Sequence, residues 1–235
     1  MSEKHLSSQF DSDLIDISTA VLQMGGLVEA QVRTAIRALE AFDITYAEEV
    51  IAAEPRVNKM EIDIDAHCSN IIARRQPAAR DLRFLMAISK TITNLERIGD
   101  EAHSIAKRTR HIIGEAPRAA IDFSEVRVSA SLAMDLLRNA LDAMARLDTT
   151  AAVKIMRDDQ AVDSEFRGFV RKLMSHMMES PKLISISLDY LFIAKAIERI
   201  GDHATNIAEL TIYIVEGTDI RHNSQDAPEQ EADNQ

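Results

Sequence analysis

The chain has 235 residues, 46% of them hydrophobic, which is enough to build one large globular domain or two small ones. Glycine and proline are scarce, tryptophan is absent, and apolar and polar residues do not alternate as they do in strands, so the composition favours an all-α fold. The formal net charge of −11, with no dense run of Lys and Arg, argues against direct binding to nucleic acid.

Cysteine usage and the start of the chain indicate a cellular compartment. The single cysteine, Cys68, cannot form an internal disulfide. The first ten residues, MSEKHLSSQF, lack the apolar core of a signal peptide, and no run approaches the roughly 18 consecutive apolar residues of a membrane span. We therefore expect a cytoplasmic protein that does not insert into a membrane.

The first predicted helix is long and amphipathic. Its apolar stripe has three- and four-residue spacing, and the pair Gly25 and Gly26 is expected to break or loosen the helix in the middle. Asp43 is expected to cap a short helix over residues 44–54. The stripe consists of Leu14, Ile17, Val21, Met24, Val28, Val32, Ile36 and Leu39.

Pro55 is expected to end that short helix and to begin the next one, over residues 55–75, with Glu54 as its N-cap. The segment RQPAARD then predicts a turn. A third helix follows and is expected to end near Gly114 and Pro117. Its apolar stripe consists of Leu82, Leu85, Ile88, Ile92, Leu95, Ile98, Ala102 and Ile105.

The second half of the chain repeats this plan. VSASLAMDLLRNALDAMARL predicts a long amphipathic helix, and Asp148 is expected to cap a short helix after it. A further helix contains AVDSEFRGFVRKLMSHMM, the chain turns at Pro181, and the last helix is expected to stop at Gly217.

The pentapeptide ERIGD occurs at residues 96–100 and again at 198–202, and eight of eleven residues are identical when 96–106 is aligned with 198–208. Internal duplication explains this. We predict two tandem three-helix bundles related by a pseudo-two-fold, over residues 1–115 and 120–217. They are joined by a linker near residues 114–122 and followed by a disordered acidic tail, 218–235.

Each ERIGD copy places two carboxylates one helical turn apart, at the flank of an apolar stripe. Such a pair repels itself, which raises its pKa values and costs stability unless a cation or an arginine neutralises it. The pairs are Glu96 with Asp100 and Glu198 with Asp202.

A second pair precedes each copy. Asp159 and Asp163 stand near an expected helix start, where anionic side chains are favoured, and the matching first-half positions are Glu54 and Asn58. If the two helices of each bundle are antiparallel neighbours, the pairs face each other and form a site for a hard cation or a carboxylate-bridged metal such as Mg or Mn. Asn58 carries no charge, so we expect weaker binding in the first bundle.

Structural alternatives stay open at this point. The carboxylates can form a solvated face or pair with Arg97 and Arg199, and Gly99 and Gly201 can serve either close helix packing or clearance beside the carboxylates. His103 lies on the flank of the first pair. Core gaps are expected to be filled by methionines, namely Met24, Met86, Met134, Met144, Met174, Met177 and Met178.

Several segments together point to a known family: the two ERIGD copies, the segment VLQMGGLVEAQVRTAI, the turn IIARRQPAARDLRFLMAISKTITNLERIGD and the closing RIGDHATNIAE. With these segments, the chain resembles the PhoU family over residues 5–222. The resemblance implies a pair of three-helix bundles. It also implies a cytoplasmic, dimeric negative regulator of the phosphate-starvation response. Such a protein links the ATPase subunit of the phosphate ABC transporter to a sensor histidine kinase, as an adaptor and not an enzyme.

The resemblance further implies multinuclear iron or zinc clusters on paired E(D)xxxD motifs. These motifs map onto Glu96 and Asp100, Asp159 and Asp163, Glu198 and Asp202, and, with a departure, Glu54 and Asn58.

A ferritin-like di-metal protein is the alternative function. Such proteins use Glu-x-x-His motifs on two of their helices, whereas this chain offers only Asp100-x-x-His103 and Asp202-x-x-Thr205. A helical scaffold with no metal role is a third possibility. No P-loop, nucleophile elbow or HExxH motif is present.

Overall fold

The computed structural model describes residues 8–115 and 121–218. Over these residues the chain forms helices and no strands, as the composition predicts. In chain order the helices are α1 (Ser8–Ala41), α2 (Ile44–Arg75), α3 (Ala79–Glu115), α4 (Ser124–Arg146), α5 (Thr149–Glu179) and α6 (Ile184–Glu216), with a short 3-10 helix, η1 (Pro181–Leu183), before α6. The predicted tail lies outside the described residues except for Thr218, as does most of the predicted linker.

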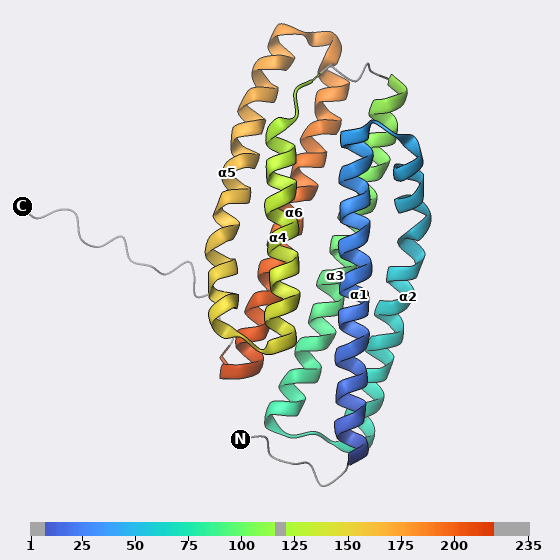
Figure 1. Cartoon of the computed structure of the whole chain (residues 1–235), viewed down its shortest axis with the longest axis vertical. Coiled ribbons are helices and arrows are strands. Elements are labelled where there is room, and N and C mark those ends of the chain that lie inside the picture. Colours follow the sequence, from blue (N-terminus) through green and yellow to red (C-terminus); the bar gives the residue numbers. More distant parts are fainter. Residues whose placement is uncertain (1–7, 116–120, 219–235) are drawn as a thin grey trace, which may run out of the picture.

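Two three-helix bundles lie side by side in an elongated body (Figure 1). Helices α1 to α3 form one bundle and α4 to α6 the other. Between the bundles, the described residues make contacts only from α1 to α4 and from α3 to α6, so each helix that crosses the boundary meets its own copy. This is the pattern of a two-fold interface, and it confirms the predicted pseudo-symmetry.

The turns between the first two helices of each bundle match closely. Asp43 accepts a hydrogen bond from the backbone N–H of Thr45, and Asp148 accepts one from the N–H of Ala151, which confirms both predicted caps. The residue before each cap has positive φ, 57° at Phe42 and 53° at Leu147. The equivalent positions of these turns are therefore 105 residues apart, whereas the ERIGD copies are 102 apart.

The predicted helix break at Pro55 is wrong, because α2 runs through the proline without interruption. A proline inside a helix loses one backbone hydrogen bond, but the buried side chains of Val50 and Val57 anchor the helix in the core on both sides of it. Glu54 is consequently an interior residue and not an N-cap. Helix α5 is likewise continuous through Asp159, which therefore lies in mid-helix and not near a start.

The predicted break at Gly25 and Gly26 is also wrong, since α1 is continuous there. A Cβ at Gly25 would meet the side chain of Leu141 on α4 at 2.7 Å. The glycine thus allows a close approach of the first helices of the two bundles.

The predicted apolar stripes form the core, except that Leu82 is exposed and Leu14 is only partly buried. Ile17, Val28, Leu95 and Ile105 are fully buried, and Cys68 is a buried thiol. Of the seven methionines predicted to fill core gaps, Met24 and Met144 are buried and Met134 and Met177 pack against the core, whereas Met86, Met174 and Met178 are exposed. No helix of the described residues is long and apolar enough to cross a bilayer.

Candidate functional site

The carboxylates of the second bundle meet where α5 passes closest to α6. A Cβ built at Gly201 would lie 2.6 Å from Oδ1 of Asp159, so the Asp159 carboxylate occupies the space that a larger side chain would fill. Val162, one turn along α5, lies 3.6 Å from the same point. The glycine inside the second ERIGD copy therefore gives room to a carboxylate as well as to close packing.

Mutual repulsion shows that the four predicted ligands of the second bundle share one neighbourhood. Burial, Asp202 and Asp163 raise the pKa of Asp159 to about 6. Burial and Glu198 likewise raise the pKa of Asp202. The α5 pair and the ERIGD pair are thus brought together as the sequence predicts.

A lysine that the sequence analysis did not single out neutralises part of this charge. Lys195 Nζ donates to both carboxylate oxygens of Glu198 from one turn earlier on α6. The hydroxyl of Thr205 lies beside Asp159 and lowers its pKa. The i, i+3 spacing of Lys195 and Glu198 was a readable signal for this pair.

The first bundle holds a similar but less acidic group. Burial and Asp100 raise the pKa of Glu96, and burial and Glu54 raise that of Asp100. Nδ1 of His103 lies 2.9 Å from Oε2 of Glu54. Asn58 is half-buried on α2 and contributes no charge.

The helix register makes each residue of the first-bundle carboxylate group equivalent to one residue of the second-bundle group. Val57 packs 3.3 Å from a Cβ built at Gly99, just as Val162 packs against Gly201, and Val57 and Val162 are 105 residues apart. Glu54 is therefore equivalent to Asp159, as the sequence analysis assumes. The partners of these two carboxylates are equivalent as well, because His103 faces Glu54 where Thr205 faces Asp159.

The donor chemistry of both groups suits a metal ion, since half-buried carboxylates that repel one another are relieved by a cation. In the described parts of the chain, however, no three His, Cys, Asp or Glu side chains converge as ligands of one ion. Glu198 is turned toward Lys195 and Glu54 toward His103. For the carboxylates to converge on a cation, the side chains of Glu198 and Glu54 would have to rotate away from Lys195 and His103.

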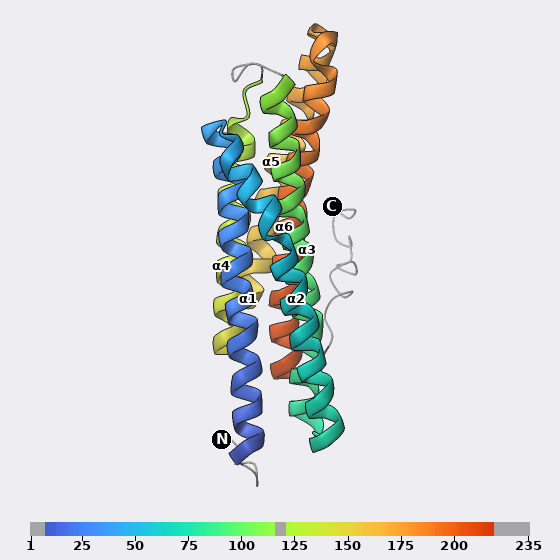
Figure 2. The ribbon, with the colours of Figure 1, turned by 90° about the vertical axis from the view of Figure 1, so that its right-hand side faces the viewer.

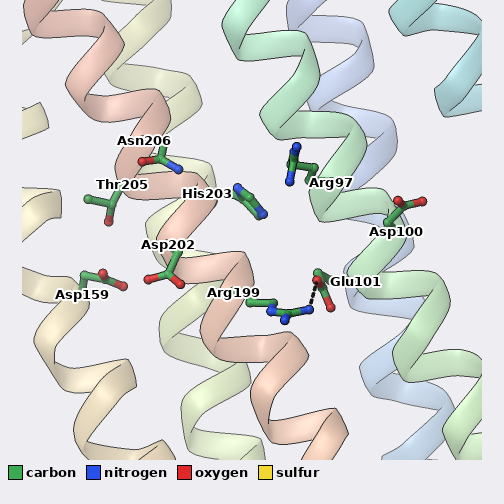
Figure 3. Close-up of a pocket in the computed structure, with 9 residues that line it drawn as sticks. All are labelled: Arg97, Asp100, Glu101, Asp159, Arg199, Asp202, His203, Thr205 and Asn206. Carbon is green, nitrogen blue, oxygen red and sulfur yellow. Dashed lines mark hydrogen bonds and ion pairs between the residues drawn. The ribbon is translucent and has the colours of Figure 1, made fainter. Parts of the chain in front are cut away.

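A groove of about 660 Å³ crosses the seam between α3 and α6 and joins the two groups (Figure 3). Asp159 and Asp202 line one end of it and Asp100 the other, with Arg97 and Arg199 between them. The full lining is Arg97, Asp100, Glu101, Asp159, Arg199, Asp202, His203, Thr205 and Asn206.

Polar contacts cross this seam and join α3 to α6. Arg199 on α6 donates to Glu101 on α3 at 3.1 Å, and Nδ1 of His203 lies 3.0 Å from Oδ1 of Asn94. Burial and the nearby arginines lower the pKa of His203 to about 4, so the imidazole is neutral near pH 7. Asn94 and Glu101 were not among the predicted site residues, although both are one helical turn from Arg97 or Ile98 on the face that meets the other bundle.

A second groove, of about 560 Å³, is lined by Glu54, Asp100 and His103 of the first-bundle group. Its floor holds Asp189, a largely buried residue of α6. Asp189 accepts a hydrogen bond from Arg108 at 3.2 Å and lies 2.6 Å from Nδ1 of His111, and both partners belong to α3. The bundles are therefore linked by charge at two places along the seam.

Comparison with known proteins identifies relatives of the whole chain. The family model described as "PhoU domain" matches residues 21–109 and again residues 127–211. A phosphate-specific transport system accessory protein PhoU homolog from a Burkholderia species is 53% identical over 234 residues, covering 99% of both chains. The PhoU protein of Escherichia coli K12 is 45% identical, over 93% of this chain and 90% of its own.

Solved structures agree with the fold. The crystal structure of PhoU from Pseudomonas aeruginosa superposes with a TM-score of 0.86 at 44% identity, covering 89% of this chain and all of that chain. A phosphate transport system regulatory protein PhoU from Streptococcus pneumoniae gives a TM-score of 0.82 at 25% identity, over 89% of this chain and 98% of its own.

Proposed function

The chain belongs to the PhoU family, and from this premise we propose that it is an accessory protein of a phosphate transport system that represses the phosphate-starvation response. The observation that carries the proposal is similarity to a PhoU homolog along 99% of both chains, which includes both ERIGD copies and both carboxylate groups. Regulation then requires different affinities for two states of a partner.

We propose two partners in the cytoplasm. One is the ATPase subunit of the phosphate ABC transporter, and the other is the sensor histidine kinase that reads its activity. The protein acts between them as a homodimeric adaptor and not as an enzyme. The groove between the bundles supports this role, because it is a polar surface shared by both halves of the chain.

We further propose that metal ions bind both carboxylate groups, as multinuclear iron or zinc clusters or as Mg or Mn. Asp159, Asp163, Glu198 and Asp202 would hold the metal of the second bundle. The first bundle would use Glu54, Asn58, Glu96 and Asp100. A bound cation would neutralise the repelling carboxylates and join neighbouring helices of each bundle. Family membership favours this regulatory metal protein over the ferritin-like alternative.

Deletion of the gene tests the proposed regulation. In high phosphate, the deletion strain should express alkaline phosphatase that the parent strain represses, and a plasmid copy of the wild-type chain should restore repression. A copy with Glu198→Ala and Asp202→Ala separates the metal proposal from the regulatory one. Unchanged repression in the deletion strain would refute the regulatory proposal whatever the metal content.

A further inference from the structure

The end of the second bundle exposes apolar side chains that the core does not use. We define the hairpin tip as residues 171–188, where α5 turns through η1 into α6. Met178 is 83% exposed and Met174 is 59% exposed, one turn apart on α5. Ile184 and Leu188, also one turn apart, are exposed on α6. Apolar groups gathered at one exposed end indicate a contact surface.

The hairpin tip is also basic, although the protein is acidic. Residues 171–188 have three cationic side chains and one anionic, so the rest of the chain carries a formal net charge of −13. Lys172 pairs with Asp122 and Glu125, but Arg171 and Lys182 are exposed and make no ion pair with the described residues. These two charges are therefore available to an anionic surface.

The shape of this end is convex. The α5–α6 hairpin extends beyond the other helices at its end of the body, as the two perpendicular views show (Figures 1 and 2). Neither groove on the α3–α6 face is lined by a residue of the hairpin tip. A convex, basic tip with exposed methionines fits a deformable anionic surface.

We propose that the hairpin tip docks on the surface of a bilayer that contains anionic phospholipids. Arg171 and Lys182 contact the headgroups, and Met174, Met178 and Ile184 reach the boundary of the acyl chains. The acidic remainder of the protein is repelled by the same surface, so the body stands end-on. Contact is confined to side chains of the tip, and no helix spans the bilayer.

The first bundle supplies an internal comparison. Ser69 and Ala73 occupy the α2 positions equivalent to Met174 and Met178, 105 residues earlier. The corresponding end of the first bundle thus lacks the two methionines of α5, although it keeps exposed Leu82 and Met86 at the positions of Ile184 and Leu188. Met174→Ser with Met178→Ala gives the second tip the residues of the first without touching the core.

Cosedimentation with lipid vesicles tests the proposal directly. The wild-type chain should bind vesicles of phosphatidylcholine with about one-third phosphatidylglycerol, and should lose the binding in pure phosphatidylcholine or in high salt. Met174→Ser/Met178→Ala should weaken binding about tenfold, as should Arg171→Glu/Lys182→Glu. Ile62→Ser, at an exposed isoleucine of α2, should leave binding unchanged.

A fluorescent label gives a second readout that does not depend on affinity. Cys68 is buried and burial raises the pKa of its thiol to about 12, so a cysteine introduced by Met178→Cys can be labelled selectively. An environment-sensitive dye at residue 178 should shift to the blue on the anionic vesicles and be quenched by spin-labelled lipid. The same dye at residue 62 should show neither effect.

Absence of wild-type binding to the anionic vesicles, or equal binding by the methionine variant, would overturn the proposal and assign the tip to a protein partner. The test uses lipid alone and does not rest on the proposed regulatory function. A failure of repression in the deletion strain and a failure of vesicle binding are therefore separate results.

Discussion

The Asp159 carboxylate lies against the backbone of Gly201, with Oδ1 only 2.6 Å from the position that a Cβ would take. In the first bundle, Gly99 faces the methyl group of Val57 at 3.3 Å instead. The two ERIGD glycines therefore differ in what they make room for. Gly201 accommodates a candidate metal ligand, and Gly99 accommodates Val57 and the buried side chain of Gln31.

Gly201→Ala is predicted to displace Asp159 and to weaken metal binding in the second bundle. Alanine favours the helix by about 1 kcal/mol over glycine, so the thermal stability of the metal-free protein should change little or rise slightly once the carboxylate has moved. Metal titration followed by calorimetry, with elemental analysis of the bound fraction, measures the loss.

Gly168→Ala is the matched control, because no atom lies within 4 Å of a Cβ at that position of α5. It should stabilise the protein by up to about 1 kcal/mol and leave metal binding intact. Equal metal affinity in Gly201→Ala and Gly168→Ala would show that the position of Asp159 does not matter to binding.

Asn58→Asp is predicted to strengthen metal binding in the first bundle. The substitution gives this group the charge that Asp163 gives the second, and an ionised oxygen binds a hard cation better than an amide oxygen does. The wild-type chain should show one tighter and one weaker class of site, and the variant should bring the two together. Isothermal titration with Mn²⁺ or Zn²⁺ resolves the classes.

Removing the predicted metal ligands of one bundle at a time shows which bundle holds each class of site. Glu198→Ala/Asp202→Ala should abolish the tighter class, and Glu96→Ala/Asp100→Ala the weaker one. Metal content that is the same in both double variants and in the wild type would place the metal elsewhere or nowhere.

Much of this architecture follows from the sequence because its signals are local. Asp43 and Asp148 are caps recognisable from the chain alone, and the repeated ERIGD fixes the register of α3 and α6. The juxtaposition of Asp159 with Asp202 then follows from antiparallel packing of neighbouring helices.

What the sequence did not reveal depends on packing between helices. Pro55 normally ends a helix, but buried neighbours on both sides hold α2 straight through it. Met178 resembles a core residue by type, but it lies in the last turn of α5, away from the core, and is exposed. Likewise, the contact of Asn94 with His203 depends on which faces of two distant helices meet.

The pKa of Asp159 predicts a pH dependence for the metal-free protein. The folded value of about 6 is above the ordinary 3.8, so the folded state favours the protonated carboxyl. Stability should therefore fall as pH rises from about 4 through about 6, where ionisation in the folded state becomes costly. Asp159→Asn should melt higher than the wild type near pH 8, and the difference should vanish near pH 4.

Thermal melts in a chelator across this pH range measure the effect. Asp158→Asn is the adjacent control, because its carboxylate is exposed and pairs with Lys154. That variant should be unchanged or slightly less stable near pH 8. A wild-type melting temperature that rises from pH 4 to pH 8 by more than that of Asp159→Asn would contradict the prediction.

Asp189→Ala is predicted to weaken the junction between the bundles. The largely buried carboxylate accepts from Arg108 and contacts His111, and Arg108 also stacks over the ring of Phe192 at 4.0 Å. Loss of hydrogen bonds between charged groups should cost about 2 kcal/mol of unfolding free energy. Urea denaturation measures the cost, and Asp189→Asn, which keeps an acceptor, should lose less.

The exposed ion pair of Asp142 with Arg146 is the matched control, because both residues belong to one helix and the pair does not link the bundles. Asp142→Ala should cost less than about 1 kcal/mol, because both groups are solvated and belong to one helix. If Asp189→Ala costs no more than Asp142→Ala, the charge contact across the seam does not hold the bundles together. A large cost with a broadened transition would instead show that the two bundles begin to unfold separately once this link is removed.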